Sequence, residues 1–436
     1  MEQPSEEEQI ANAKAICEAI IANWRKKLID AANAQGEPIC STNGTVLKET
    51  SIGEINAMLE AIRPHLRIGP APFISKPIPF DSFQIDLSGL YITANPASAE
   101  IGSLMSCTYE GSQFTGQMSF KAQMEGSTCF DHVIFINDVT FRSVFVGNVS
   151  FKNAIFEGVA DFNHTKFDGK ADYSNVSFNK DALFRRARFS LECDFKNAEF
   201  NNRAIFNSAQ FSEYVDCTRT QFHGDVDFSS SKFEAKTTFN EALFNKPPWF
   251  HGTTLHQDTS FYQAKFCSFK TENDLNAYRT LKQKMGDFRA TTEEGRFFSY
   301  EQRTSCNLML QRNWFSITGN LSNLYDLISD YGENIAKPII WLDVITIYFT
   351  GWYYIDGGIT AENVLTESWL TKINPALGLA LQNIFNPLGL FNKQAPLIVH
   401  NPWVALLSII QSMLTFSVLA LLLLAIRRRF HKGNGQ

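Results

Sequence analysis

The sequence predicts a mainly β solenoid, followed by a helical segment and a membrane domain. Three observations support this fold class. Aromatic residues recur at a fixed spacing through the middle of the chain, small side chains stand two residues before them, and two long apolar segments lie near the C-terminus. The 436 residues are enough for several domains and a sizeable core.

The aromatic repeat runs from Phe145 to Phe266, with Leu255 in place of an aromatic residue near its end. A second series, offset by six residues, runs from Phe151 to Phe261. The first series occupies every eleventh position, at Phe156, Phe167, Phe178, Phe189, Phe200, Phe211, Phe222, Phe233 and Phe244. Residues two apart in an extended backbone face the same way, so each short strand offers one large and one small inward group. The spacing therefore predicts stacked coils around a dry aromatic core.

A resemblance to pentapeptide repeat proteins rests on two segments, GVADFNHTKF at 158–167 and NRAIFNSAQF at 202–211. The match is to the Phe-rich variant in which units of five and six residues alternate, and it covers roughly 107–268. The resemblance implies a right-handed quadrilateral β-helix with about 22 residues in each coil. Coils of this kind stack by strand pairing at ~4.8 Å.

Four further regions surround the solenoid, which we place at 107–269. We expect an amphipathic helix over 1–34 and a Pro/Gly-rich capping region over 35–106. A helical linker over 270–336 should start at a capping box of Thr271 and Asp274. A second box is expected at Thr291 or Thr292 with Glu294.

The C-terminal region, 337–430, reads as a membrane domain with two transmembrane helices, 337–355 and 403–426. The second segment has 24 residues without a charge, about 36 Å as a helix, which exceeds the ~30 Å hydrocarbon layer. The cluster of Arg427, Arg428 and Arg429 places the C-terminus in the cytoplasm by the positive-inside rule. With two spans, both termini are expected to be cytoplasmic. The stretch NPALGLALQNIFNPLGLF between the spans is apolar enough to form a re-entrant segment.

The order of segments also resembles membrane-anchored pentapeptide repeat proteins of bacteria. The resemblance rests on AYRTLKQ at 277–283, DLISDYGENIAKPIIW at 326–341 and the terminal RRRF at 427–430. It implies a multi-pass protein of the bacterial inner membrane.

Composition and motifs favour a binding protein over an enzyme. No GxSxG, GxxxxGK[ST], HExxH or GxGxxG motif is present, so we expect no catalytic residues, cofactor or metal. The net charge of −6 argues against a nucleic-acid binder. The eight cysteines form no CxxC pair and are interpreted as reduced packing residues.

Two groups of outward residues are candidates for partner contacts. Asp172, Asp194 and Asp216 recur once in each expected coil and should form an acidic column, either a solvated ladder or a site for a cation or basic partner. Leu183 and Ile205 share an outward position one coil apart and should form an apolar pair. Three basic residues, Arg185, Arg186 and Arg188, flank this pair and could steer an acidic partner.

Two polar residues fall at membrane depth. Asp343 lies in the first expected span and is either a structural partner of the second span or part of an ion or proton path. The second span offers Gln411 as its partner, together with Ser408, Ser412 and Thr415.

The interpretation with most support is a non-enzymatic, membrane-tethered scaffold. Its cytoplasmic solenoid would bind an unknown protein partner or a second copy of the chain. A channel or transporter-like protein with a pore-like domain is the first alternative, although no TVGYG-like filter is present. A third alternative comes from the resemblance to soluble pentapeptide repeat proteins that mimic DNA and inhibit gyrase, which present a strongly acidic surface. Between 130 and 269 there are 17 Asp and Glu against 15 Lys and Arg, so mimicry ranks last.

Overall fold

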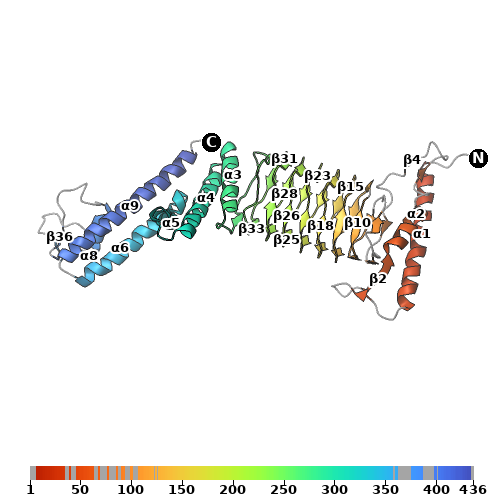
Figure 1. The fold of residues 1–436 in the computed structure, drawn as a ribbon, viewed down its shortest axis with the longest axis horizontal. Coiled ribbons are helices and arrows are strands. Elements are labelled where there is room, and N and C mark those ends of the chain that lie inside the picture. Colours follow the sequence, from red (N-terminus) through yellow and green to blue (C-terminus); the bar gives the residue numbers. More distant parts are fainter. Residues whose placement is uncertain are drawn as a thin grey trace, which may run out of the picture. The chain divides into compact units, whose positions relative to one another are not determined.

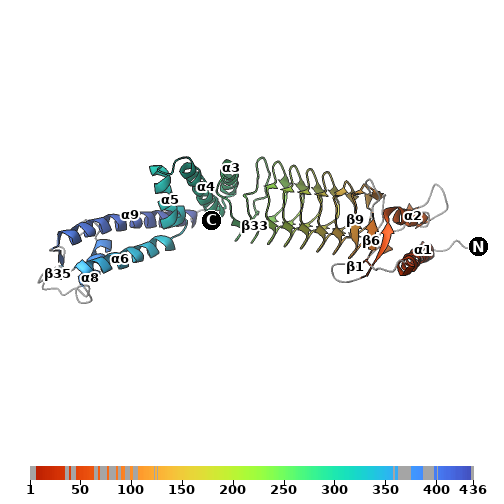
Figure 2. The same ribbon diagram turned by 60° about the horizontal axis from the view of Figure 1, so that its bottom comes forward.

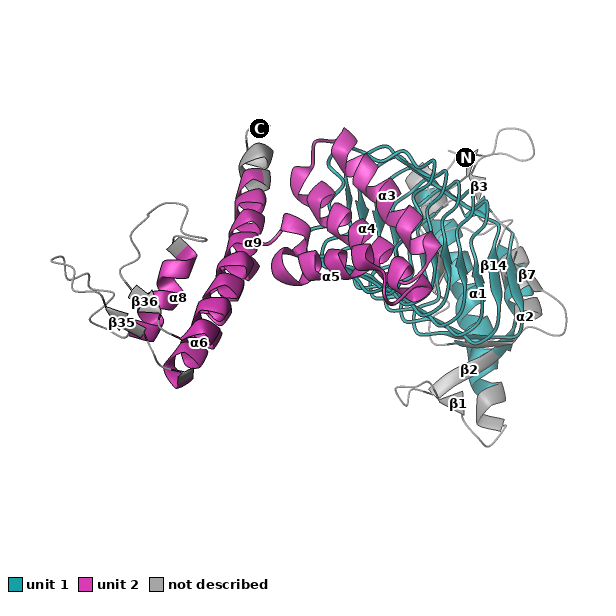
Figure 3. Cartoon of the chain, turned by 60° about the vertical axis from the view of Figure 1, so that its left-hand side comes forward, with its two compact units in different colours: residues 1–268 teal, residues 269–436 magenta. Residues whose placement is uncertain are grey.

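The computed structural model divides the chain into two compact units, Met1–Ser268 and Phe269–Gln436 (Figure 3). We consider each unit by itself. The structure describes residues 6–34, 46–62, 107–121, 126–356, 375–385 and 401–433. It also describes short strands at 39–40, 67–68, 76–77, 85–86, 90–93, 99–101, 123–124, 359–361 and 397–399.

The first unit is a β-solenoid whose strands form four parallel sheets, apart from one antiparallel pair at the end of the longest sheet (Figure 1). The β9 sheet contains β1 (Ile39–Cys40), β2 (Val46–Ser51), β6 (Leu90–Thr93), β9 (Gln113–Thr115), β13 (Ile134–Phe135), β17 (Ile155–Phe156), β21 (Ser177–Phe178), β25 (Glu199–Phe200), β29 (Gln221–Phe222), β33 (Leu243–Phe244) and β34 (Lys265–Phe266). The β10 sheet contains β7 (Ala99–Ile101), β10 (Met118–Phe120), β14 (Val139–Phe141), β18 (Ala160–Asp161), β22 (Ala182–Leu183), β26 (Ala204–Ile205) and β30 (Val226–Asp227).

The other two sheets complete each coil. The β11 sheet contains β11 (Gln123–Met124), β15 (Val144–Phe145), β19 (Lys166–Phe167), β23 (Arg188–Phe189), β27 (Gln210–Phe211) and β31 (Lys232–Phe233). The β8 sheet contains β5 (Ile85–Asp86), β8 (Cys107–Thr108), β12 (Thr128–Cys129), β16 (Val149–Ser150), β20 (Ala171–Asp172), β24 (Cys193–Asp194), β28 (Val215–Asp216) and β32 (Thr237–Thr238). The coils stack side by side in about seven turns (Figure 2).

Aromatic rings fill the interior, as the sequence predicts. Phe167 stacks on Phe189 at 4.6 Å between ring centroids, and Phe145 stacks on Phe167 at 5.3 Å. Rings from opposite sides of the coil meet edge to face, as Phe184, which follows β22, and Phe195, which follows β24, do at 5.8 Å. Both arrangements suit the ring quadrupole, and all these side chains are buried. The prediction of a β-solenoid is therefore confirmed.

The coil length changes along the solenoid. Met118 pairs with Val139, whereas Ala160 pairs with Ala182, so the earlier coil is one residue shorter than the later one. The shorter coils account for the looser aromatic spacing before Phe145.

Every eleventh residue from Asn153 to Gln263 has a positive φ. Asn tolerates this left-handed conformation best among residues with a Cβ, and Asn153, Asn175 and Asn197 occupy such corners. Asn197 Nδ2 also donates to Asn175 Oδ1 at 3.0 Å, one coil away. At a different corner, a Cβ on Gly169 would lie 2.3 Å from the Gly147 carbonyl oxygen, so only glycine fits there.

The N-terminal region extends the solenoid and covers its end. Helix α1 (Glu6–Ala34) packs against α2 (Ile52–Ile62) and β2, and it buries Cys17, Ile21 and Leu28. Within the expected capping region, β5, β6 and β7 pair in parallel with β8, β9 and β10. This region therefore adds strands to the first coil. A small antiparallel pair, β3 (Arg67–Ile68) and β4 (Lys76–Pro77), also lies there.

The second unit begins with α3 (Glu272–Asp287), α4 (Thr291–Arg312), α5 (Ile317–Ser329) and the short η3 (Asp330–Gly332). The expected capping box of Thr271 and Asp274 is confirmed at α3. The box expected at Thr291 or Thr292 is wrong, because Ala290 precedes α4 and makes no side-chain cap hydrogen bond. Helix α5 was not expected as a separate element.

Helices α6 (Ala336–Asp356), α8 (Pro375–Phe385) and α9 (Pro402–Gly433) follow, with β35 (Ile359–Ala361) paired to β36 (Leu397–Val399). The three helices lie side by side (Figure 1). They pack against one another around Phe349, Tyr353, Ala380 and Val404. Among the helices that the structure describes, only α9 is long and apolar enough, over Pro402–Arg427, to cross a membrane by itself. By this criterion the expectation of two such spans is wrong, because only the second of the two expected segments meets it. Helix α6 occupies the other expected segment, but Lys337 and Asp343 lower its apolar character.

Candidate protein-binding surface

The outward side chains of the solenoid form columns. Parallel pairing places residues of successive coils directly beside one another, with the backbone spacing of a sheet. Because the interior is filled by stacked rings, chemistry is available only on these outer columns. Each of the four sheets carries a different column.

An apolar pair occupies the middle of the β10 sheet. Leu183 lies directly beside Ile205 in the strand register, and both side chains are half-buried. Asp161 precedes Leu183 in the same column, and Asp227 follows Ile205. Trp249 extends the column beyond Asp227 through an isolated parallel bridge, and it is 41% exposed. The pair is thus bracketed by two carboxylates on its own sheet.

The three arginines lie outside this column. Arg188 belongs to β23 in the neighbouring β11 sheet, where it pairs with Lys166 on one side and Gln210 on the other. Arg185 and Arg186 are exposed at the corner between β22 and β23, and Arg186 has a φ of 56°. The nearest charges along the strand ladder to Leu183 and Ile205 are therefore acidic.

The acidic column lies on the β8 sheet, where Asp172, Asp194 and Asp216 are adjacent in register. Each carboxylate accepts a hydrogen bond from the backbone N–H two residues later, at 2.7–2.8 Å. Such Asx turns shape the corner that follows each strand. The aspartates thus have a structural role in the corners.

Asp194, in the middle of the column, has a shifted pKa. Burial raises the pKa of Asp194, the hydrogen bond from the Lys196 amide opposes this, and the charges of Asp172 and Asp216 raise the pKa further. Burial and the nearby Asp216 carboxylate raise the pKa of the Tyr214 hydroxyl to about 12. Among the described residues, no three His, Cys, Asp or Glu side chains lie close enough to hold a metal ion.

Sequence reasoning missed a second apolar pair. Ile134 pairs with Ile155 on the β9 sheet, and both side chains are half-buried. The two belong to a shorter coil, so a search at the period of the later coils passes over them. Phe135 and Phe156 are 21 residues apart, whereas the later coils have 22 residues, and this difference in spacing could have revealed the shorter coil.

Gln411 lies in a buried polar cluster between α6, α8 and α9. Its Oε1 accepts hydrogen bonds from the Tyr353 hydroxyl and from Asn383 Nδ2, both at 2.8 Å. Its Nε2 donates to the Ala380 carbonyl at 3.1 Å. Asn383 also bonds Ser408, and its carbonyl accepts from Thr415. The cluster ties α8, which lies within the segment expected to be re-entrant, to both neighbouring helices.

Asp343 is not part of this cluster. It lies on an exposed side of α6, whereas the partners of Gln411 come from Tyr353 on α6 and from α8. The structure therefore does not bring together the two membrane-depth residues that the sequence suggested as partners.

Comparison with known protein families agrees with this geometry. The family model for pentapeptide repeats (nine copies) matches residues 120–166, 162–210, 184–232 and 218–265. No curated protein and no solved structure matches the chain significantly. The matched residues coincide with the stacked coils from β10 to β34. Residues 120–265 therefore form a pentapeptide-repeat β-solenoid.

Proposed function

We propose that this chain is a non-enzymatic scaffold, tethered to a membrane, whose solenoid binds a protein partner. One observation carries the binding role: Leu183 and Ile205 form a stacked apolar pair on a rigid ladder, bracketed by Asp161 and Asp227. A rod packed with rings holds these four side chains in line without a pocket. The right-handed, quadrilateral form of the rod belongs to the same proposal, and the four parallel sheets support its four sides.

The chemistry of the column indicates the kind of partner. At ~4.8 Å between strands, Asp161 and Asp227 lie about 14 Å apart with the two apolar side chains between them. A partner segment with apolar groups between two basic side chains would match this order. Complete burial of the half-buried pair would supply about 2 kcal/mol, and the carboxylates would favour a correctly oriented basic partner.

The membrane tether rests on α9, whose 26-residue apolar stretch is long enough to cross a bilayer. Helix α6 packs antiparallel to α9, because Phe349 and Tyr353 near its end meet Val404 near the start of α9. Its outward side carries the exposed Ile340, Ile347 and Ile355, which suit contact with lipid. The exposed Asp343 lies on the same side in the first half of α6, nearer to Lys337 than to the far end of the helix. We therefore propose that α6 enters the bilayer alongside α9. The bacterial inner membrane and cytoplasmic termini are parts of this proposal.

A crosslinking pull-down from membranes tests the binding role with matched variants. Leu183→Asp/Ile205→Asp should abolish partner recovery, while Ile134→Asp/Ile155→Asp, a stacked outward pair on another sheet, should not. Recovery by the wild type should fall with salt, and Asp161→Asn/Asp227→Asn should weaken that dependence. Equal recovery by the wild type and the Leu183/Ile205 variant, with all variants folded, would show that this column is not the contact surface. Size-exclusion chromatography of the same variants tests whether the partner is a second copy of the chain.

A channel is the second candidate, because a polar cluster of Tyr353, Asn383 and Gln411 lies between α6, α8 and α9. These groups are bonded to one another, which favours a packing role over an ion path. Measuring ion flux through reconstituted vesicles distinguishes a packing role from an ion path. A flux through the wild type that differs in the Gln411→Leu variant would support a channel.

A further inference from the structure

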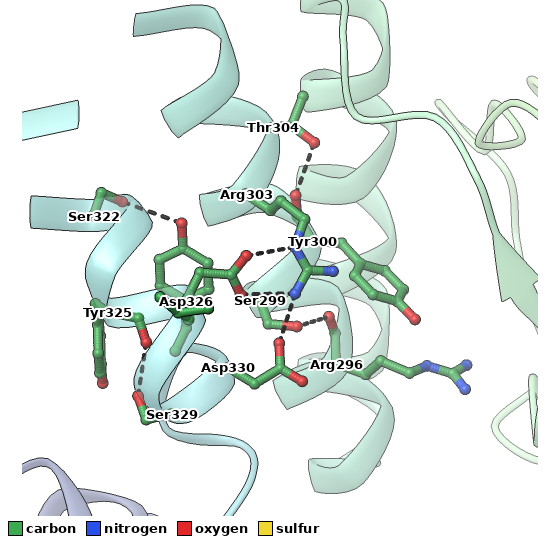
Figure 4. Close-up of polar contacts among 12 residues, drawn as sticks. Arg296, Ser299, Tyr300, Arg303, Thr304, Ser322, Tyr325, Asp326, Ser329 and Asp330 are labelled. Carbon is green, nitrogen blue, oxygen red and sulfur yellow. Dashed lines mark hydrogen bonds and ion pairs between the residues drawn. The ribbon is translucent and has the colours of Figure 1, made fainter. Parts of the chain in front are cut away.

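Helix α5 turns its polar side toward the protein. From α4, Arg303 donates to Asp326 through Nε at 2.8 Å and through Nη2 at 2.7 Å, and Nη2 also lies 2.7 Å from Asp330 Oδ1 (Figure 4). The Ser322 hydroxyl bonds the Tyr331 hydroxyl at 3.2 Å. The paired carboxylates raise the pKa of Arg303, so this guanidinium stays charged. These contacts fix the rotation of α5 about its own axis.

The opposite side of α5 and the turn before it are mainly apolar and exposed. Two residues on this side differ: Asn320 is polar and donates to the Trp314 and Ser316 carbonyls, and Ile328 is buried. Six large side chains there are 48–84% exposed: Trp314, Phe315, Ile317, Leu321, Leu324 and Leu327. No charged residue occurs between Arg312 and Asp326. An amphipathic helix in a soluble protein normally faces its core with the apolar side, and here the orientation is reversed. An exposed surface of this composition is typical of a membrane or protein contact.

The neighbours of α5 indicate what its exposed apolar side contacts. It packs against both α6 and α9, the helices proposed to enter the bilayer, and Trp341 Nε1 of α6 donates to the Leu327 carbonyl at 3.3 Å. Because α6 and α9 are antiparallel, the end of α9 that carries Arg427 lies near the start of α6 and Lys337. Apolar side chains beside basic groups at the end of a span match an anionic lipid surface.

We propose that α5 is an interfacial helix whose apolar side lies in the headgroup region of an anionic bilayer, with Trp314 as its anchor. This inference rests on the proposed membrane tether. The exposed α5 residues then form a lipid-binding surface at the base of the anchor. Arg303 and its two carboxylates hold the helix in the orientation that lipid contact needs.

Quenching of tryptophan fluorescence tests this contact in the full chain, reconstituted in vesicles of phosphatidylcholine and phosphatidylglycerol. The contribution of Trp314 to the fluorescence is the difference between the emission of the wild type and that of the Trp314→Phe variant. Lipids brominated near the glycerol backbone should quench it more strongly than lipids brominated near the acyl-chain ends. Leu321→Glu/Leu324→Glu should abolish the quenching. The matched control Thr318→Glu/Ser323→Glu, which adds the same charge at exposed positions off the apolar side, should retain it.

An alkaline wash of the vesicles tests the membrane tether separately from the interfacial position of α5. If the wild type resists the wash but the contribution of Trp314 to its fluorescence is unquenched, the interfacial helix is overturned while the tether stands. If crosslinking then shows dimers that Leu321→Glu/Leu324→Glu dissolves, a second copy covers α5, which also overturns the lipid contact. Release of the wild type by the wash would overturn the tether and this inference together.

Discussion

Replacing Tyr173 with Phe should stabilise the solenoid. Tyr173 stacks between Phe151 and Phe195 in one ladder, with ring centroids 5.0 Å apart on both sides. Its hydroxyl is buried and has no hydrogen-bond partner among the described residues, and burial raises the pKa of Tyr173 well above its usual value. An unpaired buried hydroxyl costs about 1–3 kcal/mol, whereas Tyr173→Phe keeps every ring contact.

Native-state hydrogen exchange measures the effect where it arises. The Tyr173 and Phe195 amides donate to the carbonyls of Asp194 and Asp216 in the next coil. A gain of about 1–3 kcal/mol slows their exchange by about 5- to 150-fold if they exchange by opening of the coils. Phe195→Tyr, which adds a hydroxyl to the same ladder, is the matched control and should speed exchange. Unchanged or faster exchange in Tyr173→Phe would mean that the hydroxyl has a partner, such as a buried water, and would refute the reasoning.

Three further predictions concern the rod and the anchor. Phe195→Ala should cost roughly 3–5 kcal/mol, and the exposed Lys196→Ala less than about 0.5 kcal/mol; equal losses of amide protection would contradict the inward assignment. Asp194 has a folded-state pKa above its unfolded value, so its stability contribution is present at low pH and is lost as pH rises through the folded pKa. Asp194→Asn should therefore raise the free energy of unfolding at neutral pH slightly, by under about 1 kcal/mol. The gain should shrink in acid, and a gain that grows in acid would oppose this reasoning. Compartment-sensitive reporters at Gln436 and near Lys372 should report the cytoplasm and the opposite side; a cytoplasmic signal from both would exclude two spans.

Local sequence patterns were enough to predict the solenoid. Alternation along an extended strand fixes which side chain points inward, so Phe167 and Phe189 had to lie in the core wherever the coils stacked. The same alternation placed Leu183 and Ile205 outward and adjacent, as the register shows. The capping box at Thr271 followed from residues three apart on one turn of helix.

Other features depend on contacts between segments far apart in the sequence. A search at a single period could not find Ile134 beside Ile155, because the coils lengthen by one residue along the solenoid. The partners of Gln411 are Tyr353 and Asn383, and only the packing of three helices brings them together.

The orientation of α5 depends both on a local sequence pattern and on contacts between distant segments. The sequence itself determines that α5 is amphipathic, with apolar residues on one side and Ser322 and Asp326 on the other. Helical periodicity cannot say which side faces the protein. The ion pairs of Arg303 decide it, because a guanidinium on α4 binds the carboxylates of Asp326 and Asp330, which lie much further along the chain. Amphipathic patterning is a local property of the chain, whereas the choice of the buried side belongs to the tertiary structure.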